Sequence, residues 1–266
     1  MSPFIPPGWS AGDVERELID APARAYVPFE GLEMVERPGW AQLTCALFPD
    51  GGFNGVERSR LREDEADQVI TQTIAGYARR GLQFRWSVPP GSTPANLGAR
   101  LAAAGLVATE VLAMARSTAH DLAVPAGVTV EEIGPSRAED FTRVMAEGWA
   151  APLGALRHCH HAALADPLRR QRLFLALVEG EPAGVATAFV FTRSVYLLGA
   201  VVLPRFRQRG AYRALSAARL SLARDLGLPL ATSHAMASTS APLLARQGFD
   251  AWFRFSSFGP APRVKM

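Results

Sequence analysis

One stretch of this chain decides its fold: Val202-Leu203-Pro204-Arg205-Phe206-Arg207-Gln208-Arg209-Gly210-Ala211-Tyr212-Arg213. Apolar residues after it recur at spacings of three and four as far as Leu226, and Gly227 ends the pattern, which predicts a helix from Ala211. The first N–H groups of a helix lack partners within it, and the helix dipole places positive charge there. Gly210 lets a ligand approach the backbone closely, and three arginines surround it. The stretch therefore predicts an anion site that fits a pyrophosphate.

Strand and helix patterns fill the rest of the second half. Three strand patterns lead up to the quoted stretch, and turn compositions such as Glu179-Gly180-Glu181-Pro182 separate them, which predicts an antiparallel meander. We expect strands at 128–133, 173–178, 183–191, 195–202, 228–233 and 249–258, and helices at 137–148, 156–165, 211–226 and 239–247. This order predicts an α/β domain whose long helix follows the last strand of the meander.

The first half repeats the later part of this order. Leu101-x-x-x-Gly105-Leu106 matches Leu244-x-x-x-Gly248-Phe249, which indicates a duplicated unit. Its equivalent of the anion loop, residues 54–61, lacks the glycine spacing and leads into Glu63-Asp64-Glu65, whose carboxylates repel phosphate. We therefore expect one anion site per chain. The repeated elements are a helix at 63–80, a strand at 82–88, a helix at 94–104 and a strand at 107–115.

Length and charge agree with two domains. A chain of 266 residues is long for one domain, and we divide it into residues 1–123 and 124–266. The first part holds 11 arginines and 15 acidic residues, a charge of −4, whereas the second holds 17 basic and 10 acidic residues, a charge of +7. A polyanionic ligand therefore fits the second domain.

Targeting signals and metal motifs are not expected. The first residues lack a basic segment followed by an apolar run, and no stretch approaches the ~20 apolar residues of a membrane span, which favours a cytoplasmic protein. The two cysteines, Cys45 and Cys159, lie in different halves, which favours reduced thiols. In His158-Cys159-His160-His161 only two ligands share a helix face, so we expect no metal.

The quoted loop resembles that of the GNAT superfamily of acyl-CoA-dependent N-acyltransferases. After a strand ending in Val-x-Pro, Arg207-x-x-Gly210-x-Tyr212 matches the family's loop except at Tyr212, which replaces a residue with little or no side chain and either stacks on the cofactor or obstructs it. The resemblance implies tandem GNAT-like domains with a mixed α/β sheet: residues 124–266 bind acetyl-CoA as co-substrate, and residues 1–123 are a degenerate repeat. It implies that the cofactor is bound by Val201, Val202, Leu203, Arg207, Gln208, Arg209, Gly210, Ala211, Tyr212, Arg213 and Ser238.

The acid and base of this chain differ from those the family often uses. The family's glutamate on the meander strand is missing, and Leu244 stands where the family often has a tyrosine acid. His234 is our first choice of base, because an imidazole with a pKa near ~6.5 removes protons at neutral pH, and Glu147 is the second. The alternatives are a hydrogen-bonded histidine at a strand end and a solvated glutamate. For Ser238 and Ser240 the alternatives are contact with the cofactor and capping of the next helix.

We therefore expect an N-acetyltransferase that acts on a primary amine of a small molecule or a protein. A non-catalytic acyl-CoA-binding or regulatory module is the alternative, because the usual acid and base are missing. A nucleic-acid ligand is disfavoured, since the basic residues gather at one loop without interleaved aromatic residues. We expect no membrane partner, and either a monomer or a homodimer.

Overall fold

The structure is a computed structural model, and it describes residues 3–261. They form two compact units that alternate along the chain. Unit 1 comprises the chain through Phe29 together with Ala113–Ala235 and Thr239–Trp252. Unit 2 comprises Glu30–Leu112, Met236–Ser238 and the chain from Phe253 onward. Strands β5 (Val107–Ser117) and β11 (Asp250–Gly259) contribute residues to both units.

The sheet of unit 1 is mixed. An antiparallel meander joins four strands, and a fifth strand, β10, lies parallel to β9. Most of β8 is buried on both faces, as expected for a strand between two layers of helices. The strands are β6 (Val128–Glu132), β7 (Gln171–Val178), β8 (Glu181–Val190), β9 (Ser194–Val202) and β10 (Leu230–Met236).

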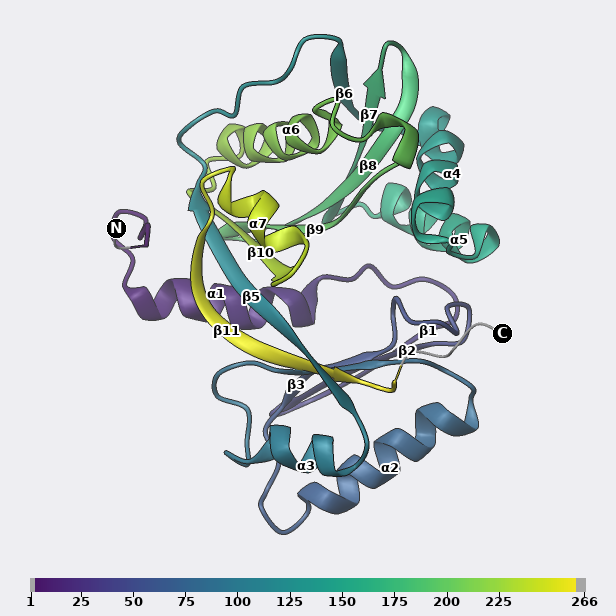
Figure 1. Cartoon of the computed structure of the whole chain (residues 1–266), viewed down its shortest axis with the longest axis vertical. Coiled ribbons are helices and arrows are strands. Elements are labelled where there is room, and N and C mark those ends of the chain that lie inside the picture. The colour runs from purple at the N-terminus through teal and green to yellow at the C-terminus, as the bar shows by residue number, and fades with distance from the viewer. Residues whose placement is uncertain (1–2, 262–266) are drawn as a thin grey trace. The chain divides into compact units, whose positions relative to one another are not determined.

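Helices cover both faces of this sheet (Figure 1). α6 (Ala211–Asp225) packs on β6 to β9 from one side, and α4 (Ala138–Trp149) and α5 (Leu153–Ala165) pack from the other. A 3-10 turn, Pro135–Arg137, precedes α4, and the short helix α7 (Ser240–Ala245) follows β10. The loop between β9 and α6 follows the last strand of the meander.

α1 (Ala11–Arg24) brings the start of the chain into unit 1. A capping box begins it: the Asp13 N–H donates to Ser10 Oγ, and the Ser10 N–H donates to the Asp13 carboxylate at 2.8 Å. Its buried face, which includes Ala21, packs with Phe189 of β8 and Tyr196 of β9. The sequence predicted both of these strands but not the helix that packs on them.

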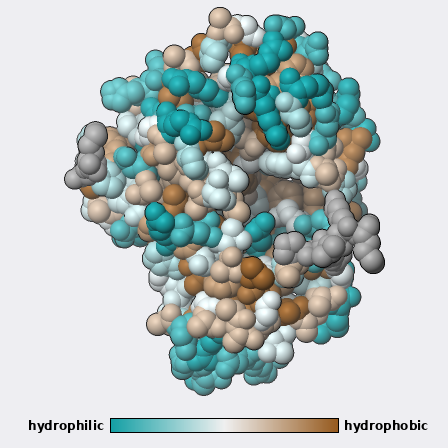
Figure 2. All heavy atoms as spheres, in the orientation of Figure 1, coloured by the Kyte–Doolittle hydropathy of each residue, from teal (hydrophilic) through white to brown (hydrophobic). Residues whose placement is uncertain are grey.

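Unit 2 is a sheet that carries α2 (Ala66–Arg79) and α3 (Leu97–Ala103). Its core includes Tyr77 of α2, Leu101 of α3 and Trp86 of β4, all of them buried. The outer surface at α2, at the bottom of Figure 2, is hydrophilic, as expected for an amphipathic helix. β3 pairs antiparallel with β2 and parallel with β4, and the end of β11 pairs with β4. The strands are β1 (Leu32–Arg37), β2 (Trp40–Cys45), β3 (Gly55–Ser59) and β4 (Arg85–Val88).

Most of the predicted helices and strands are confirmed to within a few residues, including the meander and the long helix at 211–226. The loop predicted at residues 54–61 is wrong, because Gly55–Ser59 form β3. Val56 and Ser59 are buried there, and Trp86 Nε1 donates to Ser59 Oγ at 2.9 Å. The connection from β3 to α2 is instead residues 60–65, which contain no glycine and keep the three acidic residues.

The boundary predicted after residue 123 divides the two copies of the predicted duplication, and it stays a prediction. The compact units follow a different division, because α1 packs in unit 1 and the end of β11 in unit 2. Within residues 3–261, no helix combines the length and the apolar character that crossing a membrane requires.

Candidate functional site

The loop between β9 and α6 has the backbone of an anion site. A 3-10 turn, Pro204–Phe206, leaves β9, and the chain then enters the left-handed region twice, with φ of +64° at Gln208 and +86° at Gly210. Gly210 is the N-cap of α6, and no side chain caps the helix. An uncapped helix start directs N–H groups outward, and left-handed residues beside it help N–H groups converge on one point. This backbone conformation is compatible with an anion loop, which stays a prediction.

Protein groups already contact two of the predicted arginines. Arg209 pairs with Glu179 across 2.5 Å, and Arg213 Nε donates to the Ala123 carbonyl at 2.8 Å. Arg207 is exposed, and no ion pair involving it occurs within residues 3–261. Arg207 is therefore the predicted arginine best placed to meet an incoming anion.

The segment before β6 lies against this loop, which the sequence did not predict. A Cβ atom added to Gly210 would come within 2.4 Å of Pro125 Cγ and 2.9 Å of Pro125 Cβ. The neighbouring Ala123 is the residue whose carbonyl accepts from Arg213. Residues 123–125 therefore form one wall of the loop.

Tyr212 lies in the first turn of α6. Its side chain is partly buried, and its hydroxyl interacts electrostatically with the guanidinium of Arg219, which lies two turns further along the helix. Burial raises the pKa of the Tyr212 hydroxyl, and the charge of Arg219 opposes that rise.

β9 and β10 separate beside this loop. Their parallel ladder consists of three residue pairs and ends at Tyr196 and Thr232. Beyond it, the register between β8 and β9 shifts, with Thr187 opposite Leu198 and Ala186 opposite Ala200. Gly199 is the extra residue, with φ of +50°, so β9 carries a bulge where it leaves β10.

The bulge determines which N–H groups of β9 face the gap. The Leu203 N–H donates to the Ala183 carbonyl of β8 at 2.9 Å, and alternate residues of a strand direct their backbone groups to opposite edges. Leu203 and Val201 therefore face β8, whereas Val202 and Ala200 face the side of β10. Of the predicted strand residues, Val202 has a backbone suited to pair with a ligand in the gap.

The end of α4 packs on β9 beside the bulge. A Cβ atom added to Gly148 would lie 2.4 Å from Val201 Cγ2, and one added to Gly199 would lie 2.7 Å from Trp149 Cη2. Trp149 as a residue is 47% exposed, which leaves an apolar surface beside the bulge. Glu147, the second predicted base, is exposed and forms an ion pair with Arg205.

His234 is held by α1. Its Nε2 lies 2.8 Å from the Leu18 carbonyl oxygen, which can only accept, so Nε2 carries the proton and donates it. The ring also meets Tyr196 edge-on, with 5.9 Å between centroids. Burial lowers the pKa of His234 to about 4. These contacts favour the hydrogen-bonded strand-end role over that of a base at neutral pH.

Two further predicted residues, Ser238 and Ser240, follow β10 along the chain. Ser238 is exposed in the turn after β10 and belongs to unit 2. The prediction that it or Ser240 caps the next helix is wrong, because Thr239 is the N-cap of α7 and no side chain caps that helix. Within the described residues, no three histidine, cysteine or acidic side chains lie close enough together to hold a metal ion. His160 is buried against α4 instead, with its Nδ1 2.7 Å from Thr142 Oγ1.

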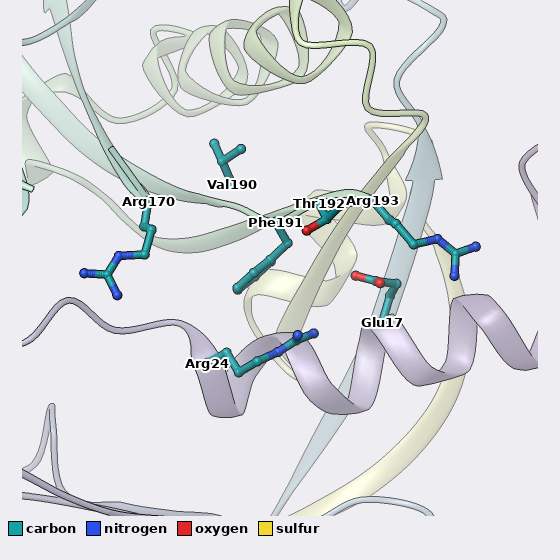
Figure 3. A pocket seen from close by; sticks show the side chains of 7 residues that line it. All are labelled: Glu17, Arg24, Arg170, Val190, Phe191, Thr192 and Arg193. Atoms are coloured by element: carbon teal, nitrogen blue, oxygen red, sulfur yellow. The ribbon is translucent and has the colours of Figure 1, made fainter. Parts of the chain in front are cut away.

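A separate cavity of about 390 Å³ opens at the other end of β9, where α1 faces the turn between β8 and β9 (Figure 3). Arg24 lies over the Phe191 ring there, 5.3 Å from its centroid. Most charged groups around it already have protein partners, so we assign it no role in the site. Arg170 pairs with Asp166, Arg193 pairs with Asp13, and Ser194 Oγ donates to Glu17.

A family model matches much of unit 1. Residues 139–249, from α4 to the residue before β11, match the model of the Acetyltransferase (GNAT) family. A tandem GNAT protein from the clavulanic acid biosynthesis pathway is 14% identical and has a TM-score of 0.60, over 99% of this chain and 92% of that one. These matches show a GNAT superfamily fold. No curated protein sequence matches it.

Other solved structures extend the GNAT fold over nearly the whole chain. A GCN5-related N-acetyltransferase from Kribbella flavida is 16% identical, with a TM-score of 0.66 over 97% of this chain and 98% of that one. A functionally unknown conserved protein from Staphylococcus epidermidis ATCC 12228 is 13% identical, with a TM-score of 0.64 over 88% and 95%. At these identities the likeness shows the fold alone. The predicted tandem GNAT fold is confirmed.

Proposed function

We propose that this GNAT protein transfers an acetyl group from acetyl-CoA to a primary amine of a small molecule or a protein. The observation that supports the proposal most is the uncapped start of α6, with left-handed residues at Gln208 and Gly210, directly beside the gap between β9 and β10. A pyrophosphate at the helix start would meet converging N–H groups and Arg207. The neighbouring gap would take the pantetheine arm.

The strand gap fits an extended ligand that pairs with a strand edge. Val202 and Ala200 direct their backbone groups to that side, where the ladder to β10 has ended. An amide-containing arm can add to such an edge as a further strand. An N–H group directed at the thioester carbonyl would stabilise the charge that develops on its oxygen, which is worth ~3 to 4 kcal/mol per donor in hydrolases.

Acetyl-CoA supplies a thioester whose sulfur is the leaving group. The acceptor nitrogen forms a bond to the carbonyl carbon, the carbon–sulfur bond breaks, and the nitrogen loses one proton to water or the thiolate. In this protein, β9 orients the carbonyl, and Trp149 shields one side of the gap from water. Position and backbone charge carry the proposed catalysis, and no side-chain base is required of His234.

The experiment is a panel of amines incubated with acetyl-CoA, with mass spectrometry of the products and measurement of released thiol. Arg207→Glu should weaken acetyl-CoA binding at least about tenfold, since it replaces attraction to the pyrophosphate by repulsion, a change of ~1.4 kcal/mol or more. Arg79→Glu on α2 makes the same change of net charge in unit 2 and should leave binding unchanged. If the two variants bind acetyl-CoA with equal affinity, the loop is not the pyrophosphate site.

A non-catalytic acyl-CoA-binding module is the second candidate. It is favoured by the lowered pKa of His234 and by the ion pair of Glu147 with Arg205, which leave neither predicted base ready to accept a proton. Calorimetric binding of acetyl-CoA without thiol release across the amine panel would favour this module. Thiol release with any amine, at a rate above the spontaneous one, would exclude it.

A further inference from the structure

Arg219 lies in the middle of α6 and is only 2% exposed. Its guanidinium donates to two carbonyls and one hydroxyl: Leu215 O at 3.0 Å, Thr187 O at 3.2 Å and Ser216 Oγ at 3.4 Å. Within residues 3–261, no carboxylate forms an ion pair with it. Arg219 is therefore a buried cation that neutral oxygens solvate.

A buried charged residue destabilises a protein core. Burying a charge costs several kcal/mol unless hydrogen bonds and a counter-charge offset it, and an apolar side chain often packs at least as well. Burial lowers the pKa of Arg219 to about 10, which leaves it charged at neutral pH. Packing alone does not account for an arginine at this position. We therefore look for a role in its hydrogen bonds.

Those hydrogen bonds lead to the bulge of β9. Thr187 of β8 stands opposite Leu198 at the register shift, and its hydroxyl donates to the Leu198 carbonyl at 2.7 Å. Arg219 donates to the carbonyl of the same threonine. A bulge interrupts the regular ladder, and here side chains bind both carbonyls that flank the interruption.

The bulge has a defined effect on β9. Leu198 lies before the extra residue and faces β8, as its bond to Thr187 shows. In a regular strand, Ala200 would face β8 too, because alternate residues point to the same edge. The inserted Gly199 shifts this alternation by one residue, so that the backbone groups of Ala200 and Val202 face the gap instead.

We infer that Arg219 and Thr187 are positioning residues that hold the bulge in β9 and thereby direct the Ala200 and Val202 N–H groups at the acyl thioester. The catalytic meaning of this inference rests on the proposed function. Its structural part, support of the bulge, does not.

The test uses Arg219→Met and Thr187→Val, with Thr187→Ser as the variant that keeps the hydroxyl. Arg116→Met is the matched control, because Arg116 is also buried and also donates to neutral oxygens, the carbonyls of Ser117, His120 and Gln247. Each full-length variant is assayed for kcat per folded molecule, KM for acetyl-CoA, thermal unfolding, and hydrogen–deuterium exchange of residues 198–203.

Arg219→Met and Thr187→Val should lower kcat by about ten- to a hundredfold with little change in KM, since the pyrophosphate loop is intact. Both should speed exchange in residues 198–203, and Thr187→Ser should restore both readouts. Arg116→Met should lower thermal stability and leave kcat and that exchange unchanged. If Arg219→Met behaves like Arg116→Met and Thr187→Val like wild type, the inference is overturned.

The exchange measurement separates the two ideas. Wild-type protein without acetyl-CoA binding or turnover, but with faster exchange in Arg219→Met, would remove the proposed function and keep the support of the bulge. If the wild type is active and the variants keep its kcat and exchange rates, the proposed function is kept and the support of the bulge by Arg219 and Thr187 is removed.

Discussion

Gly210→Ala is the substitution whose effect the structure defines best. Gly210 has φ of +86°, a conformation that costs an L residue ~1 to 2 kcal/mol. The added Cβ would also lie 2.4 Å from Pro125 Cγ, well inside van der Waals contact. Overpacking of this kind costs ~1 to 3 kcal/mol, so we expect a total loss of ~2 to 5 kcal/mol.

Gly227→Ala is the matched control. Gly227 ends the same helix with φ of +69°, and a Cβ atom there would have nothing within 4 Å. Gly227→Ala should lose only the stability that the left-handed conformation costs an L residue, ~1 to 2 kcal/mol. Adding Pro125→Gly to Gly210→Ala should recover most of the difference, because it removes the ring that the Cβ meets.

Thermal unfolding and calorimetric titration with acetyl-CoA measure both parts of this prediction. Each kcal/mol should shift the melting temperature by roughly 2 to 4 °C in a chain of this size. Gly210→Ala should also weaken acetyl-CoA binding, since the displaced loop no longer converges its N–H groups. Equal melting temperatures for Gly210→Ala and Gly227→Ala would refute the contact between the loop and Pro125.

Three further outcomes follow from single contacts. Glu179→Gln should strengthen acetyl-CoA binding at low salt by up to about fivefold, because it releases Arg209 from an exposed pair worth under ~1 kcal/mol; unchanged calorimetric affinity would contradict this. His234→Gln keeps a donor for the Leu18 carbonyl and should retain turnover, whereas His234→Ala should unfold at lower temperature; a base would lose turnover in both. Burial lowers the pKa of His160 to about 4, below the ~6.5 of an unfolded chain, so its contribution is complete above pH ~6.5 and lost as pH falls towards 4, by up to ~3 kcal/mol. In urea unfolding between pH 4 and 7, the free energy of unfolding should rise with pH, and His160→Asn should reduce that rise.

The sequence predicted the loop because its signal is local. An arginine-rich turn with Gly210 before an amphipathic helix places the site and the backbone conformation together. The wall at Pro125 could not be predicted in this way, since only the folded chain brings residues 123–125 to Gly210. The base assignment to His234 met the same limit, because Leu18 lies 216 residues away.

Two signals in the sequence point to features that were not predicted. Ser10 followed three residues later by Asp13 is the start of a capped helix, and α1 begins there. Arg219 falls on the otherwise apolar face of the helix formed by Leu215 and Leu222, where a charged residue needs a buried partner. Its partner, Thr187, is recognised only once β8 and β9 are in register.

The place of α1 in unit 1 has a consequence for biosynthesis. Leu18 leaves the ribosome 216 residues before His234, its hydrogen-bond partner. At ~5 to 20 residues per second, the apolar face of α1 waits roughly 10 to 40 s for the strands that cover it. During that interval, the nascent chain exposes the apolar residues of this segment, which is the kind of surface that chaperones bind.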